Sequence, residues 1–138
     1  MSFVNVLLLT VVVGLSDGQQ LAIENPQFSG FIESRENQAV LLYRQAKFHG
    51  ELSLDSVRRI DFGYKEGKPF PLTVTLKNGE KLEVQSEKRD FVVLKGMTDG
   101  GPVVLKHPDP ISTPIHISTR KPNRKDDLTI VYLEFPAN

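Results

Sequence analysis

Residues 11–23 read VVVGLSDGQQLAI, and they align without a gap on residues 72–84, which read LTVTLKNGEKLEV. Each segment has a turn dipeptide between two apolar runs, Asp17-Gly18 in the first and Asn78-Gly79 in the second. Such dipeptides favour two-residue hairpin turns, because both turn positions need a positive φ that glycine, asparagine and aspartate tolerate. The two segments therefore predict two similar β-hairpins, and they indicate that one structural unit occurs twice in the chain.

The similarity continues beyond these hairpins. Residues 39–42 (AVLL) resemble residues 91–94 (FVVL), and a polar turn and a second apolar run follow each segment. This pattern predicts a second hairpin in each unit. Ile60 and Ile111 come at matching places after it, and each is expected to close its unit.

The connection between the two units is predicted at residues 63–71, which contain two glycines and two prolines. We therefore expect a first β unit at residues 1–64 and a second at residues 65–138, joined in one compact body. Inside the first unit, residues 24–38 are expected to form an ordered loop with Phe28 and Phe31 packed inward.

The fold class follows from the period of the apolar residues. In residues 72–84 they alternate with polar ones on both sides of the turn, which is typical of strands with one buried face. Helical periodicity is scarce along the chain. The sequence thus predicts an all-β fold, an antiparallel small barrel or sandwich built from two duplicated units of two hairpins each.

Composition excludes several classes of protein. The chain has 138 residues, of which 39% are apolar and 25% charged, and this argues against a disordered, collagen-like or coiled-coil protein. Because 17 basic residues balance 17 acidic ones, no net charge attracts nucleic acid or an anionic membrane. The absence of cysteine excludes disulfides, thiolate metal sites and cysteine nucleophiles.

The N-terminus allows two interpretations. Residues 6–15 are the most apolar stretch, too short to span a bilayer as a helix but long enough for a secretory signal that would be cleaved after Ser16. Against a signal, residues 1–5 contain no lysine or arginine, and the stretch coincides with a predicted strand. Cytoplasmic location of an uncleaved chain is slightly favoured over export with removal of residues 1–16. No transmembrane span is expected.

The short strands, the hairpins centred on Gly18 and Gly79, and the closing Ile60 resemble the pattern of small Sm-like and SH3-like barrels. The Sm family's uridine-binding residues, an aspartate and an asparagine in the first motif and an Arg-Gly in the second, have no convincing counterpart here. The resemblance therefore implies two fused small barrels, or one larger barrel or sandwich, and no family function.

One local concentration of charge comprises Arg120, Lys121, Arg124 and Lys125. Four basic residues within six positions can contact phosphates or an acidic partner surface. Two aspartates follow directly and offset half of this charge. A solvated loop before a strand is the simpler interpretation of the segment.

His107, Asp109 and His116 are the weak candidates for a metal site, since imidazole and carboxylate ligands suit divalent ions. Their spacing matches no ligand motif, so histidines on loops or strand faces are the simpler interpretation. The nucleophile elbow, the P-loop and the dinucleotide-binding glycine motif are all absent from the sequence. We expect no cofactor, no metal and no catalytic residues.

Three function classes remain, and the first is a non-catalytic module for binding or assembly that docks a protein partner or associates with itself through exposed strand edges. The second is a nucleic-acid-binding small barrel, in which Tyr43, Phe48, Tyr64 and Phe70 act as stacking platforms. The third is an enzyme whose site carries no recognised motif.

Overall fold

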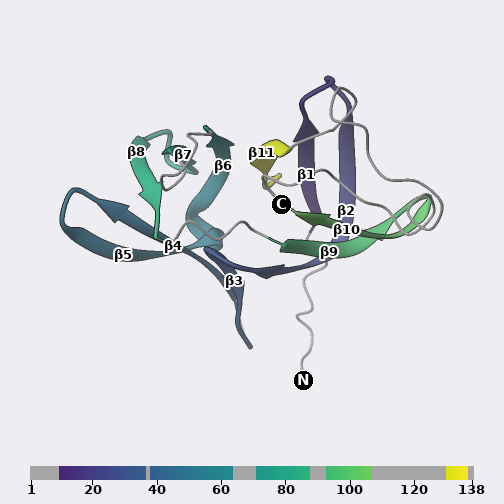
Figure 1. Cartoon of the computed structure of the whole chain (residues 1–138), viewed down its shortest axis with the longest axis horizontal. Helices are drawn as coiled ribbons and strands as arrows, with labels where there is room; N and C mark the ends of the chain where they lie inside the picture. Colours follow the sequence, from purple (N-terminus) through teal and green to yellow (C-terminus); the bar gives the residue numbers. More distant parts are fainter. Residues whose placement is uncertain (1–9, 37, 64–70, 88–92, 107–129, 137–138) are drawn as a thin grey trace.

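The computed structural model describes residues 10–36, 38–63, 71–87, 93–106 and 130–136. These residues form one antiparallel sheet that curls into an open half-barrel (Figure 1), so the predicted all-β, barrel-like fold is confirmed. In chain order the described elements are β1 (Thr10–Leu15), β2 (Gln20–Ser29), β3 (Ile32–Ser34), β4 (Ala39–Gln45), β5 (Phe48–Ser53), the single 3-10 turn η1 (Leu54–Ser56), β6 (Val57–Phe62), β7 (Pro71–Leu76), β8 (Lys81–Ser86), β9 (Val93–Thr98), β10 (Gly101–Lys106) and β11 (Ile130–Glu134). None of the helical structure in these ranges could cross a membrane.

The two hairpins predicted from the aligned segments are present and have the same turn. Gly18 and Gly79 have φ values of 92° and 95°, the left-handed region that glycine adopts without steric cost. The N–H of Gly18 donates to the C=O of Leu15 and the N–H of Gly79 to the C=O of Leu76, at 2.9 Å in both hairpins. The predicted two-residue turn with a positive φ at both positions is wrong, because the loops have three residues, 16–18 and 77–79, and Asp17 and Asn78 do not have a positive φ. A three-residue loop needs the left-handed conformation only at its last position, where the glycine stands.

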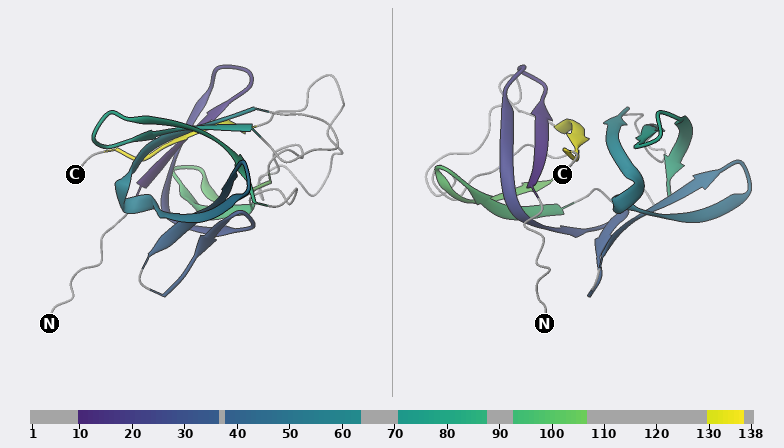
Figure 2. Two further views of the ribbon diagram at one scale, coloured as in Figure 1. Left: turned by 90° about the vertical axis from the view of Figure 1, so that its left-hand side faces the viewer. Right: turned by 180° about the vertical axis from the view of Figure 1, so that it is seen from behind.

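The strand order across the sheet is β10-β9-β2-β1-β11-β6-β7-β8-β4, and β4 pairs with both β3 and β5. We refer to β10, β9, β2, β1 and β11 as half-sheet 1, and to β6, β7, β8, β4 and β5 as half-sheet 2. Figure 1 shows these two groups of strands side by side, and the right-hand view of Figure 2 shows them from behind. Each half-sheet contains the first hairpin of one predicted unit and the later strands of the other unit.

The strand registers of the two half-sheets coincide. In half-sheet 2, Arg44 of β4 pairs with Gln85 of β8. In half-sheet 1, Met97 of β9 pairs with Glu24 of β2. Arg44 lies as many positions from its hairpin turn as Met97 does, and Gln85 lies as many positions from its turn as Glu24 does. We therefore describe residues at corresponding places, such as Arg44 and Met97, as equivalent.

The equivalence extends to the strands that close the half-sheets. β6 pairs with β7 and β11 pairs with β1, and in both pairings the register shifts by one residue, at Arg58 in β6 and at Val131 in β11. The two strands meet at the centre of the sheet, where Ile60 lies opposite Leu133. The place equivalent to Ile60 is thus held by Leu133, whereas Ile111 lies outside the described residues.

Apart from Val40, the buried apolar side chains that the structure describes in both half-sheets belong to one hydrophobic cluster. Its fully buried members include Val13 and Leu94 from half-sheet 1 and Ile60 and Leu72 from half-sheet 2. Burial of side chains of this size is the main favourable contribution to folding, about 1.5 to 3 kcal/mol for each. The shared cluster joins the two half-sheets through their concave side.

The connector predicted as a loop after Ile23 is largely a strand. β2 continues to Ser29, because Asn25 adopts a φ of 53° and the register to β9 shifts between Glu24 and Gln27. This bulge takes Pro26, which has no N–H to donate, out of the hydrogen-bond ladder. Phe28 and Phe31 are buried as predicted, and they contact Phe135 and Phe62 with ring centroids 6.5 and 5.9 Å apart.

The N-terminal strand holds a central place in the sheet. β1 lies between β2 and β11, and Val11 and Val13 are fully buried. Residues 1–9, the remainder of the proposed signal segment before it, lie outside the described residues, as does the predicted unit boundary at residue 64. The question of cleavage therefore stays a prediction.

Candidate functional site

Within the described residues, β5 pairs with β4 alone, so one side of β5 forms an open edge of the sheet. The hairpin closes through the two residues 46 and 47, with Gln45 opposite Phe48. In this geometry hydrogen bonding to β4 alternates along the strand, and Phe48, Gly50 and Leu52 make the bonds. The N–H and C=O groups of the intervening His49 and Glu51 therefore point away from β4, toward the open edge.

The equivalent hairpin of half-sheet 1 has a different edge. β10 pairs with β9 alone in the described part of the chain, and its outward-pointing position equivalent to His49 is Pro102. Proline has no N–H and prevents another strand from pairing there, a common protection of sheet edges. The two half-sheets thus share a backbone arrangement, but β5 keeps a backbone donor that β10 lacks.

An aromatic pair lies beside the β5 edge, with Phe48 exposed and Tyr43 half-buried against the hydrophobic cluster. The rings of Tyr43 and Phe48 have centroids 6.2 Å apart, and 60% of Phe48 is exposed. Both rings lie over Gly50, where a Cβ atom would come within 2.5 Å of the Tyr43 ring and 2.7 Å of the Phe48 ring. The equivalent hairpin of half-sheet 1 has the opposite arrangement. Gly96 holds the place of Tyr43, and the buried Val103 opposite it holds the place of Gly50.

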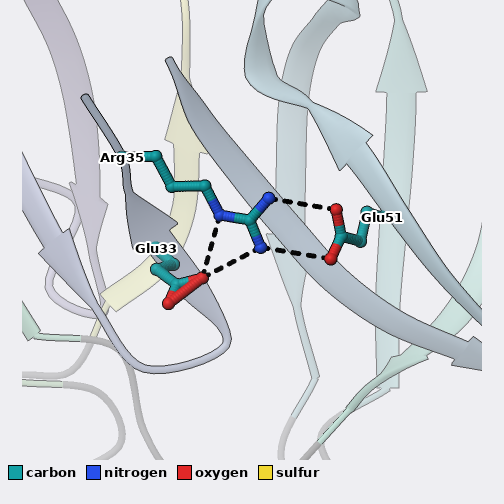
Figure 3. A network of polar contacts seen from close by, with 3 residues as sticks. All are labelled: Glu33, Arg35 and Glu51. Carbon is teal, nitrogen blue, oxygen red and sulfur yellow. Dashed lines mark hydrogen bonds and ion pairs between the residues drawn. The ribbon is translucent and has the colours of Figure 1, made fainter. Parts of the chain in front are cut away.

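Charged side chains occupy the other face of β5. Arg35 lies between two carboxylates, and its guanidinium donates to Glu33 at 3.1 and 3.2 Å and to Glu51 through two bonds of 3.1 Å (Figure 3). The hydrogen bonds from Arg35 lower the pKa of Glu51, and those to Glu51 and Glu33 raise the pKa of Arg35. The arrangement favours the ionised form of the Glu51 carboxylate beside the edge.

His49 is held in a similar way. Its Nδ1 lies 2.6 Å from one carboxylate oxygen of Glu87 and 2.8 Å from the other. The backbone N–H of Glu87 donates to the C=O of Leu42, so the segment after β8 continues along β4. Both side chains of the β5 edge that face this side, His49 and Glu51, therefore have a hydrogen-bond partner and a defined position.

A second polar cluster lies where the half-sheets meet. The guanidinium of Arg59 is 3.9 Å from the centre of the Tyr132 ring and donates to Asp61 at 3.0 Å. The hydrogen bond to Asp61 raises the pKa of Arg59. Tyr132 covers Gly14 and accepts a hydrogen bond from the side chain of Gln20. The polar groups of this cluster are thus partners of one another, and their side chains pack on the outer face of β1, β6 and β11.

Most residues that the sequence singles out lie outside the described residues. This holds for the basic cluster of Arg120, Lys121, Arg124 and Lys125, for the metal candidates His107, Asp109 and His116, and for Tyr64 and Phe70. Among the described residues, no group of three metal-binding side chains comes together. Of the four aromatic residues proposed as stacking platforms, the structure brings Tyr43 and Phe48 into contact.

His49, Gly50 and Glu51 were missed as candidates by the sequence analysis. A signal for them existed, because the second hairpins of the two units align and a proline stands in one of them where the other has His49. No protein-family model, no curated protein and no solved structure matches this chain.

Proposed function

We propose that the protein is a non-catalytic binding or assembly module, and that its β5 edge accepts an extended polypeptide segment as a further strand of the sheet. The observation that carries this proposal is the difference between the two equivalent edges, where His49 of β5 replaces Pro102 of β10. In this mode of recognition, backbone hydrogen bonds supply affinity and alternate side chains supply specificity.

The side chains beside the edge indicate the chemistry of the segment. A residue placed opposite Gly50 would contact the aromatic pair of Tyr43 and Phe48, which favours an apolar side chain. The residues before and after it in the bound segment would face Glu51 and His49. Glu51 is ionised, and His49 lies against the carboxylate of Glu87. A segment that alternates apolar and basic residues therefore fits this edge best.

We also infer that the sheet consists of two copies of one five-stranded unit whose first hairpins have changed places. Three features support this inference: the equal turns, the equal registers between β2 and β9 and between β8 and β4, and the shared bulge in β6 and β11. If the copies are related in this way, a difference between equivalent residues reflects the role of one copy and not a requirement of the fold.

The carboxylates near β5 make a nucleic-acid strand a poor occupant of this edge. Glu33, Glu51 and Glu87 lie on the charged face, and their repulsion of phosphates opposes stacking on Phe48. The basic cluster at residues 120–125 lies outside the described residues and adds no support.

The proposal is tested with a random library of seven-residue peptides selected on the full-length protein. We expect the selected peptides to alternate apolar and basic residues and to shift the amide NMR signals of residues 48–53. Binding should be lost in His49→Pro and retained in His49→Ala, because the alanine variant keeps the backbone donor. Peptides that bind His49→Pro as tightly as the wild-type protein, or a selection that yields no binder, would contradict the proposal.

A further inference from the structure

We propose that Gly30 is a hinge that decides whether the hairpin of β1 and β2 completes the sheet of its own chain or the sheet of a second copy. The β5 edge, which carries the proposed function, takes no part in this exchange. Two features of the molecule are involved, the place where the hairpin pairs and the short link that joins it to β3.

The place that the hairpin fills lies between two later strands. Apart from the pairing within the hairpin, β1 pairs with β11 and β2 pairs with β9. Val11, Val13 and Ile23 of the hairpin are fully buried in the hydrophobic cluster. A second copy supplies the same side chains in the same register, so the pairing itself does not keep the hairpin in its own chain.

A link of two residues, Gly30 and Phe31, connects β2 to β3. β3 pairs with β4, so the chain passes from half-sheet 1 to half-sheet 2 within this link. Phe31 is fixed on the side of half-sheet 2, since its C=O accepts a hydrogen bond of 2.8 Å from the N–H of Leu42 and its ring contacts that of Phe62. The change of direction therefore falls on Gly30.

The backbone of Gly30 has a φ of 125°, a value that residues with a side chain rarely adopt. Across the bend, the N–H of Phe28 donates to Oγ of Ser34 at 2.8 Å. In one extended strand these two residues would lie about 20 Å apart, so the bond exists only while the link is bent. A side chain at position 30 favours a negative φ, which opens the bend and breaks this bond.

An open link carries the hairpin away from its own half-sheet, because two residues leave no slack for it to return. Short links under strain favour exchange between copies for this reason. Each chain has one hairpin of β1 and β2 and one place for it, so reciprocal exchange between two copies fills both places. Every strand pairing is then kept, and the link alone changes its conformation.

The test places the cysteine pair Glu24→Cys/Met97→Cys in the wild-type background and in Gly30→Val. The two positions are directly paired between β2 and β9, within disulfide range. After oxidation, electrophoresis without reductant should show a disulfide within one chain in the wild-type background and a covalent dimer in Gly30→Val. Arg44→Cys/Gln85→Cys is the matched control, because β4 and β8 both follow the link and this disulfide stays within one chain in either background.

Sedimentation equilibrium at micromolar concentration should give a monomer for the wild-type protein and a dimer for Gly30→Val. Two glycines inserted after position 30 of this variant should restore the monomer, because a longer link regains slack. Gly79→Val strains a φ of 95° at the tip of another hairpin, and it should lower the melting temperature but leave the protein monomeric. A monomeric Gly30→Val protein, or equal amounts of covalent dimer in both backgrounds, would overturn the proposal.

Refolding supplies the answer if Gly30→Val does not fold. Glu24→Cys/Met97→Cys is refolded with reductant at micromolar and at sub-millimolar concentration and is then oxidised. We expect more covalent dimer after refolding at the higher concentration, because hairpins of other copies then compete with the tethered one. The same low yield at both concentrations would contradict exchange of the hairpin.

Discussion

Two cysteines at positions 44 and 85 are expected to link β4 to β8 and to stabilise the protein. Arg44 and Gln85 are directly paired in the sheet, and both side chains lie on the face away from the hydrophobic cluster. Paired Cα atoms in antiparallel strands are about 4.5 to 5.5 Å apart, which suits a disulfide. The double variant Arg44→Cys/Gln85→Cys should therefore oxidise without disturbing the core.

The size of the effect follows from the length of chain that the disulfide closes. The loop between the two positions contains about 40 residues, for which the loss of unfolded-state entropy corresponds to about 4 kcal/mol. Strain in the bond lowers this value, and we expect about 3 kcal/mol. For a chain of this size, that increase in the free energy of unfolding raises the melting temperature by about 10 °C.

The assay is thermal and urea unfolding of the oxidised and reduced forms of the same variant. Glu24→Cys/Met97→Cys is the matched variant, because this pair holds the equivalent place in half-sheet 1. It closes a loop of about 70 residues and should give a similar gain of about 3 to 4 kcal/mol.

A third variant decides whether the first hairpins have exchanged places. Without exchange, β2 would lie beside β4, and Glu24 would take the place of Gln85. Arg44→Cys/Glu24→Cys is therefore expected to stay reduced. Ready oxidation of this pair, together with failure of Arg44→Cys/Gln85→Cys to oxidise, would refute the strand order and every comparison of equivalent residues that depends on it.

Two further changes test local features of the sheet by urea unfolding. Gly14→Ala should destabilise the protein by about 1 kcal/mol, because a Cβ atom would lie 2.0 Å from the Tyr132 ring and displace it from Arg59. In a Tyr132→Ala background the same change should be neutral or stabilising, and an equal loss in both backgrounds would contradict this explanation. Ala46→Gly should stabilise by about 0.5 kcal/mol, since Ala46 has a φ of 57° at the tip of the β4–β5 hairpin; a lower unfolding midpoint would show that the turn is not strained.

Much of the candidate site depends on information that a single hairpin does not contain. The strand around His49 reads as an ordinary hairpin in the sequence, and so does the strand around Pro102. They become comparable when the registers show that both occupy the outward-pointing position of an edge strand. The hydrogen-bond partners of this edge, Glu87 and Arg35, come from positions distant in the sequence and could not be assigned to it beforehand.

The closing strand of the second unit shows the same limit. The expected match of Ile60 to Ile111 rested on spacing along the chain, which insertions between strands change at little energetic cost. Pairing with β1 and with β6 identifies Leu133 as the equivalent residue.

The sequence by itself determined the hairpins at Gly18 and Gly79 and the all-β class, because turn chemistry and period-two alternation act over a few neighbouring residues. Only the tertiary structure decided which hairpin lies beside which strand. The hairpins at Gly18 and Gly79 pair with β9 and β4 in the same register, so local pairing alone does not decide which strand each hairpin lies beside. The choice is made by long-range packing, in the cluster where Ile60 and Leu133 meet and the two half-sheets share one core.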